Sequence, residues 1–264
     1  MQTFKITLAY DGTDFVGWQR QASGTSIQGL LEDALRDLDE REVVVVGAGR
    51  TDAGVHALGQ AASFTLTRWT DAEALVRALN ARLPDSVRVL TAGHVSDAFH
   101  ARFGAKKKTY RYRIWNGDVL SPFERRWAWH VVAALDWEAM AAAAKLIEGR
   151  HDFAAFRAAG GSTRSTEREV YSSCVFRGRE LSGLPGDNRA ALITYEISGN
   201  GFLRHMVRAI VGTLAEIGRG RRRIDWMREV LAGRDRTLAG PTAPPQGLVL
   251  VGVEYDVGLL AAER

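Results

Sequence analysis

The chain has 264 residues, of which 46% are hydrophobic and 25% are charged, and its formal net charge is +4. This length and composition allow a large buried core in one big domain or two modest ones, which excludes disorder as the main state. The single cysteine, Cys174, excludes an intramolecular disulfide and a cysteine zinc site, and it fits a reducing compartment. No apolar run approaches membrane-spanning length and the N-terminus begins with an alternating pattern, so we expect a cytoplasmic protein with no membrane partner.

The residue pattern of the N-terminal half predicts four strands and two helices. Apolar and polar residues alternate over 4–10, which is the period of a half-buried strand. Thr25 with Gln28, and Thr70 with Glu73, resemble capping boxes ahead of helical apolar repeats. The elements expected in order are a strand at 4–10, a helix at 26–39, strands at 43–46 and 60–66, a helix at 74–83 and a strand at 87–95.

The C-terminal half repeats this order of elements. We expect a strand at 109–115, an alanine-rich helix capped by Asp136 and closed by Gly149, a hairpin of strands 170–177 and 190–198 around a turn at 183–188, helices at 202–217 and 225–231, and a final strand at 247–255. The order β-α-β-β-α-β is that of ferredoxin-like and RNA-recognition domains. The sequence therefore predicts an α+β fold of two such halves, 1–103 and 104–264. They would share one mixed, mainly antiparallel sheet, with helices on one face and an active-site cleft on the other.

A glycine-rich loop at 47–57 follows the expected strand 43–46 and contains several ionisable residues. Its glycines allow backbone angles that a side chain would forbid and let a ligand approach closely. Arg50, Asp52 and His56 bring opposite charges and a titratable ring into the same loop. This favours a functional site with Asp52 as its central carboxylate.

A purely structural interpretation of the loop stays open on spacing alone. Aspartate and glycine form turns for local reasons, and Arg50 could simply neutralise Asp52. His56 lacks a partner at metal-ligand spacing, which is more typical of a hydrogen-bonded structural histidine. The loop also lacks the lysine and hydroxyl of a P-loop and the spacing of a dinucleotide fingerprint, so neither nucleotide-binding interpretation is supported.

Basic residues gather in several clusters along the chain. They lie at 106–108 with Arg111 and Arg113, at 125–126, at Arg157, Arg164 and Arg168, and at 219–223. Each cluster alone is typical of a solvated face, but together they favour a polyanionic partner. Tyr110 and Tyr112 share one face of the basic strand and suit stacking on an unpaired base, although strand tyrosines also serve as core residues.

Several motifs in order resemble one known family. They are LAYDG at 8–12, GWQ at 17–19, GAGRTDAGVHA at 47–57, FHARF at 99–103, YRY at 110–112, DF and FR within 152–157, HMVR and IVG within 205–212, and GL at 247–248. On these motifs, which span nearly the whole chain, the sequence resembles the tRNA pseudouridine synthase A family. The stretches that match poorly are 157–168, 181–189 and the arginine run after Gly218.

The resemblance implies a fold, an activity and site residues. The fold is the pseudouridine synthase fold, and the activity is isomerisation of uridine to pseudouridine in the anticodon stem-loop of tRNA, at positions 38 to 40. Asp52 aligns with the family's catalytic aspartate, and Arg208 with the arginine that pairs with it and keeps it ionised. Tyr110 aligns with an active-site tyrosine on the target base, Leu248 with an apolar pocket residue, and Arg50 with an arginine that accompanies base flipping.

The resemblance also implies partners and cofactors. The family acts on tRNA as a homodimer, and a redox-neutral isomerisation needs no cofactor and no metal.

Two other classes of protein fit the sequence less well. A non-catalytic RNA-binding protein would have no use for a carboxylate in its binding loop, because an anion repels phosphate. A metal-dependent hydrolase using Asp52 and His56 would need further ligands, for which the sequence offers no convincing set.

Overall fold

The chain forms two compact units. The structure is a computed structural model that describes residues 1–68, 70–160, 165–178 and 191–256. The first unit comprises Met1–Lys108 with Val249–Arg264, and the second comprises Thr109–Leu248. The first unit therefore includes the last strand of the chain. The division of the sequence into halves at residues 103 and 104 stays a prediction.

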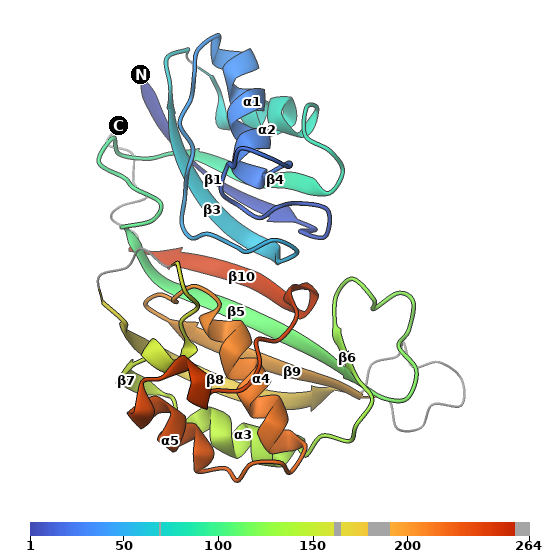
Figure 1. The fold of residues 1–264 in the computed structure, drawn as a ribbon. Helices are drawn as coiled ribbons and strands as arrows, with labels where there is room; N and C mark the ends of the chain where they lie inside the picture. Colours follow the sequence, from blue (N-terminus) through green and yellow to red (C-terminus); the bar gives the residue numbers. More distant parts are fainter. Residues whose placement is uncertain (69, 161–164, 179–190, 257–264) are drawn as a thin grey trace. The chain divides into compact units, whose positions relative to one another are not determined.

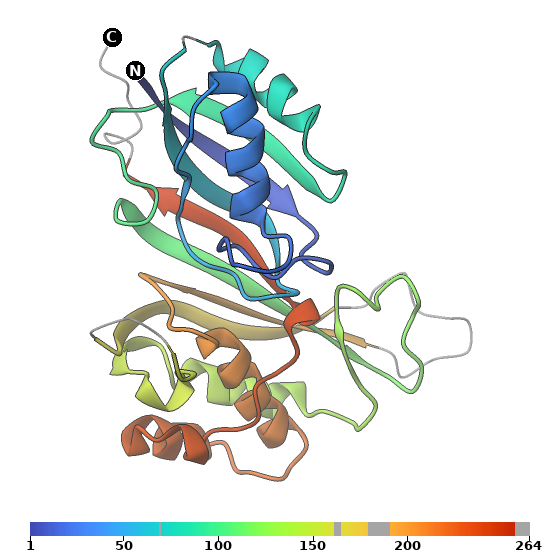
Figure 2. The ribbon, with the colours of Figure 1, turned by 45° about the horizontal axis from the view of Figure 1, so that its top comes forward.

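The first unit follows the predicted order β-α-β-β-α-β. The elements are β1 (Gln2–Tyr10), α1 (Ile27–Asp39), β2 (Val46–Gly47), β3 (His56–Leu66), α2 (Ala72–Asn80), β4 (Val87–His94), the start of β5 (Ala105–Asn116) and β10 (Leu248–Tyr255). Strand β1 pairs antiparallel with both β3 and β4, β2 pairs antiparallel with β3, and β10 pairs parallel with β3. Figures 1 and 2 show α1 and α2 on the same side of these strands.

In helices α1 and α2, the N-cap lies one residue later in the sequence than the cap that we expected. The N-cap of α1 is Ser26, whose Oγ accepts a hydrogen bond from the Gly29 amide at 3.1 Å, and not Thr25. The N-cap of α2 is Asp71, whose carboxylate accepts from the Ala74 amide at 3.0 Å, and not Thr70. In each case the residue next in sequence to the expected cap has extended backbone angles and a side chain that reaches the third amide of the helix.

The expected strand at 43–46 is mostly not a strand. Only Val46 and Gly47 pair with β3, although Val43 and Val45 are buried. Side chains of α1 take the backbone groups of Val45 instead: Glu32 accepts its N–H at 3.3 Å, and the Gln28 amide donates to its carbonyl at 3.0 Å. Val43 and Val45 are buried without the backbone pairing of a strand, so the apolar pattern of this segment matches that of a buried strand.

The second unit is built mainly on antiparallel strands and α-helices. Its described elements are the rest of β5, β6 (Trp129–Val131), α3 (Trp137–Lys145), β7 (Gly149–Asp152), η1 (Ala154–Phe156), β8 (Glu167–Gly178), β9 (Ala191–Gly199), α4 (Met206–Gly218), α5 (Trp226–Gly233), η2 (Arg236–Leu238) and η3 (Pro245–Gly247). Strand order runs β5-β9-β8-β7, β6 pairs parallel with β5, and α3 packs on β8 and on α4. Figure 1 shows α3, α4 and α5 grouped beside β7, β8 and β9.

Three features of the second unit differ from the sequence-based expectation. Helix α4 begins at Met206 rather than at residue 202, because His205 has a left-handed φ of 60° and the Arg204 carbonyl accepts the amide of Ala158 at 3.0 Å. Gly149 belongs to β7 and does not close α3. The short strands β6 and β7 were not predicted, and the turn at 183–188 lies outside the described residues.

The α+β class with mainly antiparallel strands is confirmed. Among the residues that the structure describes, no helix is both long enough and apolar enough to cross a membrane.

Candidate active-site residues

The loop between β2 and β3 carries Arg50 and Asp52 in the first unit. Arg50 is exposed, Asp52 is half-buried, and Thr51 between them is buried. The Asp52 carbonyl accepts the Val55 amide at 3.1 Å, which closes a tight turn through Gly54, whose φ is +76°. The polar side chains of the loop therefore alternate between solvent and the body of the unit.

Hydrogen bonds from three different segments fix the backbone before Asp52. Within the first unit, the Trp18 amide donates to the Thr51 carbonyl at 3.0 Å, Gln60 Nε2 to the Gly49 carbonyl at 2.9 Å, and Lys108 Nζ to the Ala48 carbonyl at 2.7 Å. Because these donors come from separate parts of the chain, the position of the Asp52 backbone is set by tertiary contacts rather than by the loop alone.

A buried tyrosine fixes the side chain next to the carboxylate. Tyr10 Oη lies 2.9 Å from Thr51 Oγ1 and accepts a hydrogen bond from Gln60 Nε2 at 3.3 Å. Burial raises the pKa of Tyr10 to about 12, against the opposing effect of these two hydrogen bonds. The phenol thus keeps its proton at neutral pH and can donate it to Thr51.

The sequence alone predicted no role for Tyr10 or Gln60 in this network. Tyr10 looked like one more apolar residue of an alternating strand. Gln60 carried a usable signal, because it is a polar residue at the start of the apolar run 60–66 and is completely buried. A buried amide needs partners, and here it finds them in Tyr10 and in Gly49 of the loop.

His56 supports the loop from its far end. It is 1% exposed, and its Nδ1 accepts the Gly12 amide at 3.0 Å and lies 3.2 Å from Asp11 Oδ1. This agrees with the expectation of a hydrogen-bonded structural histidine. In the described part of the chain, no group of three or more histidine, cysteine, aspartate or glutamate side chains is arranged to hold a metal ion.

Tyr110 lies in β5, in the second unit. Its side chain is 7% exposed, and its ring meets that of Phe202 edge-on, with centroids 5.2 Å apart and planes at 84°. Tyr112, two residues on, is fully buried, as the shared face requires. Phe202 precedes α4 and is half-buried, and no sequence motif singled it out.

Arg208, in the first turn of α4, is held by the segment that leads to β10. Its Nε donates to the Ala243 carbonyl at 2.7 Å, while its own carbonyl accepts the Ala243 amide at 3.1 Å. Next along the same segment, the Pro244 carbonyl accepts the Tyr112 hydroxyl at 2.7 Å, and burial raises the pKa of Tyr112, so the proton needed for this bond is present. Leu248, where β10 begins, is 5% exposed.

The basic strand does not present the free positive charge that its sequence suggested. Within the first unit, Lys106 pairs with Asp256 and Lys107 with Glu254, each at 3.0 Å. In the second unit, Arg111 binds Glu196 at 2.8 Å and Arg113 binds Glu124 at 3.0 Å. The acidic partners lie far away in the sequence, so inspection of the cluster alone could not find them.

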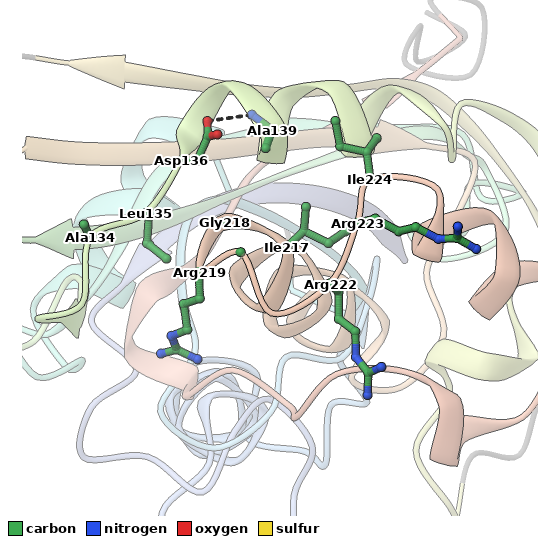
Figure 3. A pocket seen from close by; sticks show the side chains of 11 residues that line it. Ala134, Leu135, Asp136, Ala139, Ile217, Gly218, Arg219, Arg222, Arg223 and Ile224 are labelled. Carbon is green, nitrogen blue, oxygen red and sulfur yellow. Dashed lines mark hydrogen bonds between the residues drawn. The ribbon is translucent and has the colours of Figure 1, made fainter.

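A hollow of about 710 Å³ in the second unit contains none of the expected site residues. The hollow lies between the end of α4 and the start of α3. Figure 3 shows that the Asp136 carboxylate accepts the amide of Ala139. Among the residues that line the hollow are Arg219, Arg222 and Arg223. Arg219 pairs with Glu216, Arg223 pairs with Glu229, and Arg222 lies over the ring of Trp226. Arg219 and Arg223 are thus paired with carboxylates of the same unit, whereas the contact of Arg222 is to an aromatic ring.

Comparison with known proteins decides the family. The sequence model described as tRNA pseudouridine synthase matches residues 6–104 and 143–256. The chain belongs to the tRNA pseudouridine synthase family. A protein named tRNA pseudouridine synthase A from Myxococcus xanthus is 47% identical over 258 residues, which cover 98% of this chain and 94% of that protein. Proteins of the same name from Chloroflexus aurantiacus and Moorella thermoacetica are each 45% identical, covering 98% and 97% of this chain and 91% and 100% of their own lengths.

Family membership confirms the resemblance seen in the motifs and makes the chain an isomerase that acts on uridine in tRNA. It also agrees with the α+β architecture, as expected of the pseudouridine synthase fold. Among solved structures, a dye-decolorizing protein from V. cholerae is similar at 10% identity with a TM-score of 0.19, a likeness too slight to bear on fold or function.

Proposed function

We propose that the chain isomerises uridine to pseudouridine at positions 38 to 40 of tRNA, in the anticodon stem-loop, with Asp52 as the catalytic carboxylate. The observation that carries this proposal is the family match over nearly the whole chain, together with an aspartate on a loop that three separate segments hold in place. Catalytic groups need such fixed positions, because small displacements from the reacting atom are costly.

The chemistry explains why a carboxylate is suited to this task. Breaking the bond between N1 of uracil and C1′ of ribose leaves positive character on C1′, which an anion stabilises or captures covalently. The uracil then turns, C5 bonds to C1′, the C5 hydrogen leaves as a proton, and N1 gains one. The product is an isomer of the substrate, so no oxidant, energy donor or metal enters the balance.

The remaining site residues are proposed to bind the substrate. An RNA stem hides its bases, so the target uridine must be flipped out, and exposed Arg50 has the charge and reach to accompany that step. Tyr110 would pack on the flipped base, Leu248 would line the apolar side of its pocket, and Arg208 would contribute a cation to substrate binding. The resemblance of the motifs to those of the family supports these roles, and the hydrogen bonds of Arg208 to Ala243 support a fixed guanidinium.

The setting of the reaction follows from the same proposal. We propose that the enzyme works as a homodimer on tRNA in the cytoplasm, without cofactor or metal. The lone, half-buried Cys174 is compatible with a reducing compartment. Within the described residues, the unpaired exposed charge of Arg50 also supports contact with a polyanion.

Mapping the modified positions tests this proposal. An unmodified tRNA transcript is incubated with the enzyme, and carbodiimide adducts on pseudouridine are located by reverse transcription. We expect stops only at uridines of positions 38 to 40. Stops confined to another arm would refute the assigned position, and tight binding with no stops at all would favour the non-catalytic RNA-binding protein.

A further inference from the structure

The turn between β4 and β5 in the first unit presents a phenylalanine to solvent. Phe103 is 77% exposed, although most large aromatic side chains of a folded chain lie inside it. Its ring stacks on that of His100, with centroids 4.3 Å apart and planes at 29°, and the guanidinium of Arg102 lies 5.6 Å from its centroid. An aromatic ring is therefore displayed beside a cation.

The backbone beneath Phe103 is held rigidly. Buried Ala101 donates its amide to Ser63 Oγ at 3.1 Å and accepts the Tyr255 hydroxyl at 2.7 Å. The His100 carbonyl accepts the Gly104 amide at 2.9 Å, and its Nδ1 accepts the amides of Arg102 and Phe103, each at 3.2 Å. The exposed ring thus belongs to a fixed turn and not to a loose one, so binding through it costs little conformational entropy.

The chemistry of this turn fits a nucleobase. Every base offers a π-face to an aromatic ring, and stacking of this kind tolerates any sequence. Arg102 is exposed and adds the positive charge that an adjacent phosphate requires. The ring of Phe103 contacts His100 and Arg102, and a cation beside the ring suits a polyanionic partner.

We propose that Phe103, supported by His100 and accompanied by Arg102, is a platform on which an unpaired base of the RNA substrate stacks. This inference rests on the proposed function, since it assumes that the bound molecule is tRNA. It adds a contact outside the loop of Asp52. Its role is binding, and Phe103 takes no part in the chemical step.

Binding measurements on paired and unpaired RNA test the platform. Wild type, Phe103→Leu and Phe103→Tyr are titrated with an unmodified tRNA transcript and with a blunt, fully paired RNA duplex. Phe103→Leu should weaken tRNA binding about tenfold, because base stacking on an aromatic side chain is lost. Phe103→Tyr should bind like wild type, and the duplex should bind all variants equally. Leu90→Ala, which removes a half-exposed apolar side chain from β4, serves as the matched control and should change nothing.

Two results would overturn the platform: undiminished tRNA binding by Phe103→Leu, or an equal loss on tRNA and on duplex. The outcome is separable from the proposed function, because binding is read without catalysis. A chain that binds tRNA through Phe103 and forms no pseudouridine would keep this inference and lose the isomerase.

Discussion

Asp52 owes its position to residues that take no part in the chemistry. Tyr10 of β1 and Gln60 of β3 form hydrogen bonds to the loop that carries Asp52. Gly17, in the segment between β1 and α1, allows that segment to approach the same loop closely. Gly17 has a φ of +106°, and a Cβ built on it would lie 2.7 Å from the Thr51 carbonyl oxygen. A side chain there would strain its own backbone and push on the residue that precedes Asp52.

Gly17→Ala should therefore damage activity more than it damages the fold. We expect a loss of about 1–3 kcal/mol in the free energy of unfolding, from the left-handed backbone and the contact with Thr51. Isomerisation should fall by a larger factor than the unfolded fraction explains. Urea titration and initial rates measure the two effects. Gly93→Ala, where an added Cβ has no neighbour within 4 Å, is the control, and equal behaviour of the two variants would contradict the assigned role of Gly17.

At the scale of elements, one carboxylate joins helix α1 to the end of strand β3. Asp39, the last residue of α1, is buried and accepts the amides of Thr67 and Arg68, which follow β3, at 2.9 to 3.1 Å. Burial alone would raise the pKa of Asp39, but the hydrogen bonds from Arg68 and Thr67 outweigh it and lower the pKa below its ordinary 3.8. The bond between α1 and the end of β3 is therefore strongest when Asp39 is ionised.

The stability that Asp39 provides should depend on pH in one direction. Because its pKa is lower in the folded chain, the contribution is complete above pH 3.8 and is lost as the pH falls through the folded value. Asp39→Asn should cost about 1.5–3 kcal/mol of unfolding free energy at neutral pH. The difference from wild type should shrink in acid, as measured by urea titration across pH. Exposed Asp37→Asn on the same helix is the control, and a difference that grows in acid would refute the argument.

Elements with a strong period were predictable, and long-range polar contacts were not. The strand at 4–10 and the helix ending at residue 39 follow from local alternation and helical spacing, so the sequence places them almost as the structure does. The strand at 43–46 failed because Gln28 and Glu32 bind the backbone there, and no local pattern encodes that contact. In the site, spacing pointed to the Asp52 loop and the strand pattern pointed to Tyr110 as a stacking residue, whereas Arg208 and Leu248 came only from family resemblance.

At the scale of the whole molecule, the placement of charge matters more than its sum. The net charge is only +4, and ion pairs within the units offset the charge of four of the five cations in the basic run 106–113. The cations left for a polyanion are therefore fewer than the clusters suggested. Within the described residues, exposed Arg50 makes no ion pair, while Lys106 is paired with Asp256.

The salt dependence of tRNA binding should distinguish these two kinds of cation. Arg50→Ala should reduce the slope of log affinity against log salt by about 1, because one phosphate contact is lost. Lys106→Ala should change the slope less, because Asp256 already offsets its charge. Titrations at several salt concentrations measure both slopes. Equal slopes for the two variants would show that internal pairing does not decide which cations meet RNA.

Tritium release from uracil C5 tests the central claim most directly. A tRNA transcript carrying tritium at C5 is incubated with wild type, Asp52→Asn and the exposed control Asp37→Asn, and tRNA affinity is measured alongside. Forming the new bond at C5 expels that hydrogen, so wild type and the control should release tritium. Asp52→Asn should bind tRNA yet be slower by about 100-fold or more. Release by Asp52→Asn at the wild-type rate would contradict the account and place the catalytic group elsewhere.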